Sequence, residues 1–114
     1  QPTPPSAGDL GLAQPMSRPM CNGQGIVVLG SVTTPGQYAT GVQRLLNAYP
    51  GAYYLRTDQS CPSLRPATAD GNPIYAVYWP AGGVDLRSAV CAQGGGAYGK
   101  YLDYAHPSDH QVLC

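Results

Sequence analysis

The stretch GIVVLGSVTTPGQYATGVQRLLNAYPG, residues 25–51, decides the fold, because it places a strand directly before a helix. Its first part, 25–32, is an apolar run that is rich in β-branched side chains and bounded by glycine, which predicts a central strand. Apolar side chains then recur at the spacing of one helical face, at Tyr38, Val42, Leu45, Leu46 and Tyr49. The stretch therefore predicts one β-α unit.

Signals for both ends of this helix are present. Thr34 is a good N-cap, Pro35 suits the first helical position, and Gln37 completes a capping box. Pro50 and Gly51 end the helix, because proline cannot continue it. We therefore expect the helix to begin directly after Thr34.

The rest of the chain predicts three more strands and a second helix. The strands are expected over 52–57, 73–80 and 97–104, and the helix over 84–93, where glycines close it. A long connection, DQSCPSLRPATADGN over 58–72, carries the turn signal DGN. The order β-α-β-β-α-β predicts an α+β domain with a four-stranded antiparallel sheet and both helices on one face. The expected strand order in the sheet is fourth, first, third, second.

Length and charge limit the possible partners. The 114 residues suit one small domain, which we place at 21–114. Residues 1–20 are rich in proline and predict a linker, or alternatively an extension that packs on the fold. With six acidic and six basic residues, the chain has no net charge at pH 7. This argues against nucleic acid as a partner and against electrostatic docking to anionic lipid.

Four widely spaced cysteines, with no C-x-x-C pair, predict two disulfides in an oxidising, extracytoplasmic compartment. In the expected strand order, Cys21 before the first strand and Cys114 after the fourth lie at the same end of the sheet. Cys61 follows the second strand, and Cys91 lies late in the helix that runs back toward the same end. We therefore expect the pairs Cys21–Cys114 and Cys61–Cys91, although sequence alone leaves the other connectivities open.

Catalytic constellations are weak in this sequence. Asp58 and Asp70 bracket the long connection and are the candidate carboxylate pair of a glycosidase, but both positions are typical of turn aspartates. Ser60 and Ser63 have no neighbouring histidine in the sequence and no nucleophile elbow. We therefore predict a domain that is not an enzyme and has no cofactor, with a small secreted enzyme as the least favoured class.

The segment HPSDH brings together three potential metal ligands, His106, Asp109 and His110. The spacing of four would place both rings on one helical face. The neighbouring residues favour a loop instead, so we expect a surface loop and no metal site.

Strand alternation suggests a binding surface. If Tyr53, Leu55, Ile74, Ala76 and Tyr78 face the helices, the open face of the sheet holds aromatic rings and a guanidinium, at Tyr54, Arg56, Tyr75 and Trp79. Such groups can stack on sugars. Arg65 in the long connection is a further candidate ligand-binding residue. Alternatively, the rings merely cover the sheet beneath residues 1–20, through Leu10, Leu12 and Met16, or the open face is a homodimer interface.

The element order and the segment VVLGSV just before the first helix resemble SPOR domains over residues 24–104. SPOR domains are small domains of bacterial envelope proteins with a ferredoxin-like arrangement. They bind the glycan strands of peptidoglycan, chiefly through the exposed face of the sheet. The cysteines and the long connection depart from that pattern. This resemblance implies a peptidoglycan-binding module that localises its parent protein.

The stretches CNGQGIVVLGSV, YLRTDQSCPSL and GNPIYAVY look like parts of actinobacterial, especially mycobacterial, envelope proteins. In that group, such a domain is similar to the C-terminal extracytoplasmic part of membrane-spanning serine/threonine kinases, after a Pro-rich linker. The chain itself carries no kinase motif. The favoured expectation is a non-catalytic sensor or ligand-binding domain of a membrane-anchored parent, with a cell-wall ligand or envelope protein as its partner.

Overall fold

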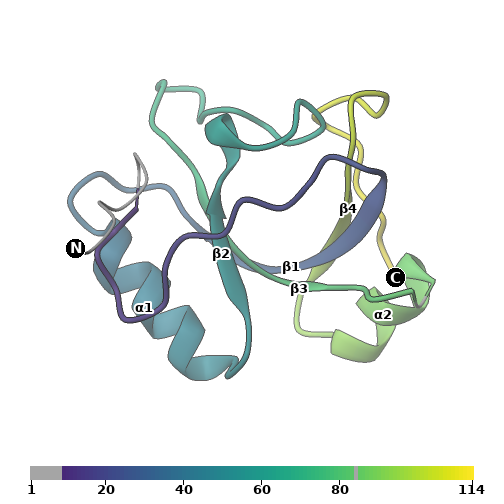
Figure 1. Cartoon of the computed structure of the whole chain (residues 1–114), viewed down its shortest axis with the longest axis horizontal. Coiled ribbons are helices and arrows are strands. Elements are labelled where there is room, and N and C mark those ends of the chain that lie inside the picture. Colours follow the sequence, from purple (N-terminus) through teal and green to yellow (C-terminus); the bar gives the residue numbers. More distant parts are fainter. Residues whose placement is uncertain (1–8, 84) are drawn as a thin grey trace, which may run out of the picture.

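The computed structural model describes residues 9–83 and 85–114 of the chain. Its elements, shown in Figure 1, are β1 (Gln24–Val32), α1 (Tyr38–Ala48), β2 (Tyr53–Arg56), the 3₁₀ helix η1 (Thr57–Gln59), β3 (Tyr75–Pro80), α2 (Leu86–Gln93) and β4 (Tyr98–Leu102). The strands form one antiparallel sheet in the order β2-β3-β1-β4. The predicted α+β class and strand order are thus confirmed. No helix among the described residues is long and apolar enough to cross a membrane.

Helix α1 begins later than the capping signals predict. Its N-cap is Gln37, which makes no side-chain capping hydrogen bond. Gly36 has a φ of 84°, in the left-handed region that a helix excludes, and the Gln37 N–H donates to the Thr34 carbonyl at 3.1 Å. Pro35 and Gly36 therefore form a turn, and Thr34 lies outside the helix.

Helix α2 is capped by Asp85, whose carboxylate accepts a hydrogen bond from the Ser88 N–H at 3.2 Å. The predicted start at Val84 lies outside the described residues. The helix ends at Gly94, which has a φ of 64°.

The two faces of the sheet are reversed relative to the prediction. Tyr54, with 0% of its surface exposed, packs with Tyr75 and Val77 beneath α1. Leu55 and Tyr78 lie on the opposite face. Strand alternation separates the two sets of side chains but does not say which set meets the helices. The prediction that Tyr54 and Tyr75 lie on an open face was therefore wrong.

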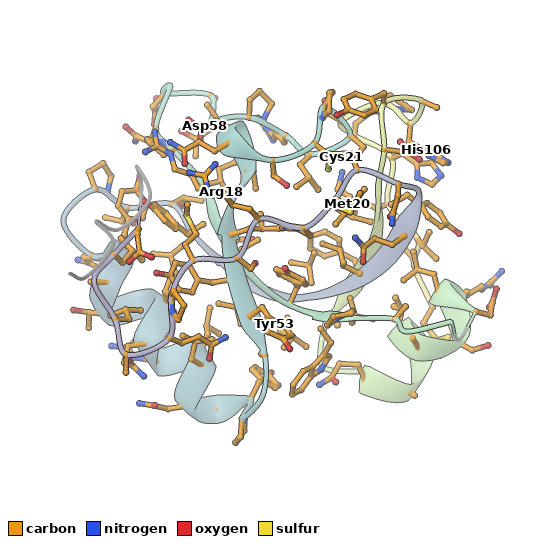
Figure 2. All side chains as sticks on the ribbon, viewed as in Figure 1. Arg18, Met20, Cys21, Tyr53, Asp58 and His106 are labelled. Atoms are coloured by element: carbon orange, nitrogen blue, oxygen red, sulfur yellow. A yellow bond between two sulfur atoms is a disulfide. The ribbon has the colours of Figure 1, made fainter. Side chains whose placement is uncertain are left out.

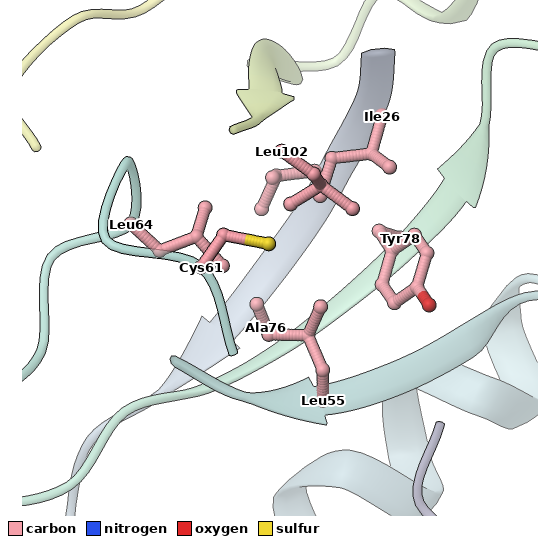
Figure 3. Packing of buried hydrophobic residues seen from close by; sticks show 8 residues of the cluster. Ile26, Leu55, Cys61, Leu64, Ala76, Tyr78 and Leu102 are labelled. Carbon is pink, nitrogen blue, oxygen red and sulfur yellow. The ribbon is translucent and has the colours of Figure 1, made fainter. Parts of the chain in front are cut away.

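The face opposite the helices is covered by irregular segments. One is the long connection, from which Cys61 and Leu64 pack onto Ile26, Leu55 and Ala76 of the sheet, as Figure 3 shows. These contacts bury apolar surface without any regular secondary structure.

The other covering segment is residues 9–23, which passes in front of β2 in Figure 1. The Ser17 N–H donates to the Tyr54 carbonyl at 2.8 Å, and the Gly23 N–H donates to the Leu102 carbonyl at 2.8 Å. Met16, together with Leu10 and Leu12, packs on the α1 side. This is the alternative in which the N-terminal extension lies on the fold, whereas residues 1–8 of the predicted linker lie outside the described residues.

The disulfides join Cys21 to Cys61 and Cys91 to Cys114, so both predicted pairs were wrong. The long connection carries Cys61 across the face opposite the helices, which separates it from Cys91 in α2 by the thickness of the sheet. After β4 the chain turns back, and Val112 pairs with Gly99 through two backbone hydrogen bonds of 2.8 and 2.9 Å. Cys114 is thereby brought to the C-terminal end of α2 instead of to the start of β1.

Candidate functional site

A cavity of about 460 Å³ lies on the sheet face opposite the helices. It follows β1 and is bounded on one side by the long connection and on the other by β4 and the tail after it. Its floor is apolar, formed by Ile26 and Val28 of β1, Leu55 of β2 and Ala76 of β3. The cavity exists because irregular segments, the long connection and the tail after β4, flank this face in place of helices.

Lys100 is the charged group buried in the wall of this cavity, with 5% of its surface exposed. It pairs with Ile26 across the sheet, so its side chain rises from the same face. The ammonium donates to the Ser108 carbonyl at 2.6 Å and makes a longer contact of 3.5 Å with the Ser63 carbonyl. Burial lowers the pKa of Lys100, and the negative charge of Asp109 opposes this shift.

Thr57 also lines this cavity. Its backbone N–H is bonded to the Ile74 carbonyl at 2.9 Å, but its buried hydroxyl has no hydrogen-bond partner among the described residues. The residue is 7% exposed. Leaving such a group unpaired costs roughly 1–3 kcal/mol, and the oxygen has almost no accessible surface through which a molecule in the cavity could reach it.

Four of the five predicted ligand-binding residues do not line the cavity, and three of these four are aromatic. Tyr54 and Tyr75 are enclosed beneath α1, and burial raises the pKa of both phenols. Trp79 also lies on the helix side, where its indole N–H donates to the Gln93 side chain at 2.8 Å and its ring meets Tyr49 edge-on. These rings build the core under the helices.

The two predicted arginines have different positions. Arg56 is held by Asp58 through two hydrogen bonds, of 2.7 and 3.0 Å, and this contact raises the pKa of the guanidinium. Arg65 lines the cavity, with its Nε–H donating to the Ala67 carbonyl at 3.2 Å. Of the five predicted residues, Arg65 alone is a wall residue of this cavity.

The histidines form a separate cluster beside β4. The imidazole of His106 is 2.5 Å from the Asp103 carboxylate and stacks on Tyr101, with ring centroids 4.8 Å apart. The ring of His110 lies 4.7 Å from that of His106. Backbone hydrogen bonding from His106 is the main cause that lowers the pKa of Asp103.

This histidine cluster lacks the geometry of the catalytic sites considered above. Ser63 donates its hydroxyl hydrogen to the Tyr101 carbonyl rather than to a histidine. Asp58, one of the two carboxylates of the predicted glycosidase pair, lies far from His106 in the view of Figure 2 and is held by Arg56. Within residues 9–83 and 85–114, no three side chains of the metal-binding types gather closely enough to hold an ion.

Lys100 and Thr57 line the cavity but are not among the site residues predicted from the sequence. A signal for Lys100 is present in AYGKYLDY, where it alternates with Tyr98 and Leu102 and so shares their face. No comparable signal marks Thr57, because its burial depends on the fold of the connection that follows it.

Comparison with known proteins does not identify a family or a function for this chain. No family model, curated protein or solved structure matches the chain. The cavity and its lining are therefore the basis for a functional proposal.

Proposed function

We propose that this chain is a non-catalytic, extracytoplasmic ligand-binding domain that serves as the sensor of a membrane-anchored parent protein. The observation that carries the proposal is the cavity of about 460 Å³, which has an apolar floor and a wall that holds the buried Lys100 together with Arg65 and Asp109. Small-molecule sites typically have volumes of roughly 300–1,000 Å³, an apolar lining and a few placed polar groups. The cavity fits this description in each respect.

The two disulfides are consistent with an oxidising compartment outside the cytoplasm. They also hold both walls of the cavity. Cys21–Cys61 anchors the connection that carries Leu64 and Arg65, and Cys91–Cys114 anchors the tail that carries Ser108 and Asp109. A pre-formed, braced cavity reduces the ordering cost of binding.

The part of the proposal that concerns the parent protein rests on the resemblance of three sequence stretches to extracytoplasmic parts of actinobacterial serine/threonine kinases. Residues 9–23 do not line the cavity, but Cys21 ties this segment to Cys61 in the connection that forms one wall, so ligand binding at that wall has a covalent connection to the N-terminal segment. A full-length parent sequence with a membrane span and a kinase domain before this chain would support the sensor role. A parent without them would contradict it.

Binding is tested by NMR with a panel of fragment-sized organic compounds. We expect shifts of backbone amides to cluster along Ile26, Val28 and Ala76. Thr33 and Thr34 are both exposed, but only Thr33 lines the cavity, so Thr33→Trp should obstruct it and Thr34→Trp serves as the matched control. Shifts that are scattered over the surface, or that survive in Thr33→Trp, would refute the cavity as the site.

Peptidoglycan binding is the alternative that the SPOR resemblance implies. In that mode the glycan contacts an exposed sheet face, whereas in this structure residues 17–23 and 57–74 lie over the face opposite the helices. No observation favours this alternative over the cavity. Retention of the domain on purified cell-wall sacculi would support it, and sedimentation at high concentration checks the predicted homodimer.

A further inference from the structure

We propose that the ligand of the cavity is an elongated organic carboxylate with an apolar tail, whose carboxylate binds the Lys100 ammonium and whose tail lies along the apolar floor. This inference rests on the proposed function and adds the chemical class of the ligand. It is carried by the buried Lys100 in the wall of the cavity and by the apolar floor along β1.

The first step concerns hydrogen bonding at Lys100. An ammonium has three N–H donors. Within the described residues, the Ser108 carbonyl takes one donor at 2.6 Å, and the Ser63 carbonyl makes a marginal contact at 3.5 Å. At least one donor is left for a ligand. A carboxylate both accepts this hydrogen bond and compensates the buried positive charge, which a neutral group cannot do.

The second step concerns the balance of charge. The cavity wall holds two cations, Lys100 and Arg65, and one anion, Asp109. The ion pairs within the described residues lie elsewhere, at Arg56–Asp58 and His106–Asp103. When all three groups are ionised, Asp109 neutralises one of the two cations, and the wall has a net charge of one positive unit. This favours an anionic ligand over a cationic one.

The third step concerns shape. Lys100 pairs with Ile26 at the start of β1, whereas Thr57 bonds to Ile74, next to the pair formed by Tyr75 and Val32 at the end of β1. Six steps of strand separate these two levels, which is roughly 20 Å at 3.3 Å per residue. The reach of the Lys100 side chain shortens this span. Between these two levels the floor is apolar, so the matching ligand is extended and apolar beyond its carboxylate.

The test compares decanoate, its neutral amide decanamide, and ω-hydroxydecanoate by NMR titration of the intact domain. We expect decanoate to bind at least tenfold more tightly than decanamide, because charge-assisted hydrogen bonds are the stronger ones. Lys100→Gln, which keeps a donor but removes the charge, should abolish this difference. Thr57→Val, which is nearly isosteric, serves as the neutral control and should leave both decanoate and ω-hydroxydecanoate unchanged, because the Thr57 hydroxyl has almost no accessible surface.

The outcomes separate this inference from the proposed function. Equal affinity of decanoate and decanamide for the unmodified domain would overturn the ligand class, while cavity-centred shifts with either probe would still support a binding site. An absence of cavity shifts with both probes and with the fragment panel would overturn both proposals. Because the comparison of decanoate with decanamide needs no variant, it stays decisive even if Lys100→Gln does not fold.

Discussion

Gly99 of β4 packs directly against Leu86 and Val90 of α2. A Cβ atom added there would lie 2.8 Å from Cγ of Leu86 and 3.0 Å from Cγ2 of Val90. Both neighbours are buried, so neither can move aside freely. We predict that Gly99→Ala lowers the free energy of unfolding by about 1–3 kcal/mol, the usual cost of overpacking a core. Urea denaturation of the two proteins measures this difference.

The control for this substitution is a double-mutant cycle. Leu86→Ala alone should cost about 2–5 kcal/mol, because it leaves a cavity. In that background the methyl group added by Gly99→Ala has room, so the additional cost of this substitution should fall close to zero. Equal costs of Gly99→Ala in both backgrounds would show that strain elsewhere, not the contact with Leu86, limits this position.

At the residue scale, the sequence shows which side chains share a face of the sheet, but it does not show which of them bind a ligand and which form the core. Strand alternation correctly places Tyr54 and Tyr75 on the same face of the sheet. The prediction assigned this face to ligand binding, whereas both side chains are part of the core under α1. Arg56, which was predicted to bind a ligand, instead forms an ion pair with its neighbour Asp58. Lys100 was not predicted as a site residue, although it alternates with the apolar residues Tyr98 and Leu102 and therefore shares their inward-facing side of the strand.

At the element scale, the N-terminal segment contributes to the core through Met16. Met16 is 8% exposed and packs with Val42 and Leu46 of α1, whereas Met20, four residues later, is 72% exposed. We predict that Met16→Ala lowers the free energy of unfolding by about 2 kcal/mol and that Met20→Ala changes it by less than about 0.5 kcal/mol. Chemical denaturation measures both variants. Small changes in the free energy of unfolding for both would contradict the packing of Met16 against α1.

Regular elements were predictable, whereas the covering segments were not. Hydrophobic periodicity identified all four strands and both helices, because each buries a repeating set of side chains. The start of α1 was misplaced because a capping signal at Thr34 competes with a left-handed turn at Gly36. Residues 9–23, 57–74 and 103–114 have no period, so nothing in their pattern reveals that they pack on the sheet or that the last two flank a cavity.

At the scale of the whole molecule, the cysteine pairing depends on these same irregular segments. The predicted strand order is right, but the pairing derived from it assumed that each loop stays near the strand it leaves. The connection instead crosses the sheet to bring Cys61 to Cys21, and the tail doubles back past Gly99 to bring Cys114 to Cys91. Strand order constrains where elements lie, and it leaves the course of long loops undetermined.

Digestion with trypsin tests this connectivity directly. Trypsin cleaves after Arg44, Arg56, Arg87 and Lys100 but not at the bonds that precede proline, so each cysteine falls in a different peptide. Without reduction, mass spectrometry should find 1–44 linked to 57–87, and 88–100 linked to 101–114. A link between 1–44 and 101–114 would contradict the course of the tail.

Removing each disulfide should then loosen a different wall of the cavity. The sequence separations of 40 and 23 residues correspond to about 4 and about 3.5 kcal/mol in the chain-entropy treatment, so Cys21→Ser/Cys61→Ser and Cys91→Ser/Cys114→Ser should destabilise the domain to similar extents. Their local effects should differ. Hydrogen exchange should accelerate over 16–23 and 57–66 in the first variant, and over 103–114 in the second.

Ligand binding connects this difference to function. Loss of Cys21–Cys61 frees the wall that holds Arg65, whereas loss of Cys91–Cys114 frees the tail whose Ser108 carbonyl holds Lys100. If the carboxylate of the ligand binds Lys100, the second variant should therefore lose more of the preference for decanoate over decanamide. Titration of both variants measures this preference, and equal losses would mean that the tail does not position the lysine.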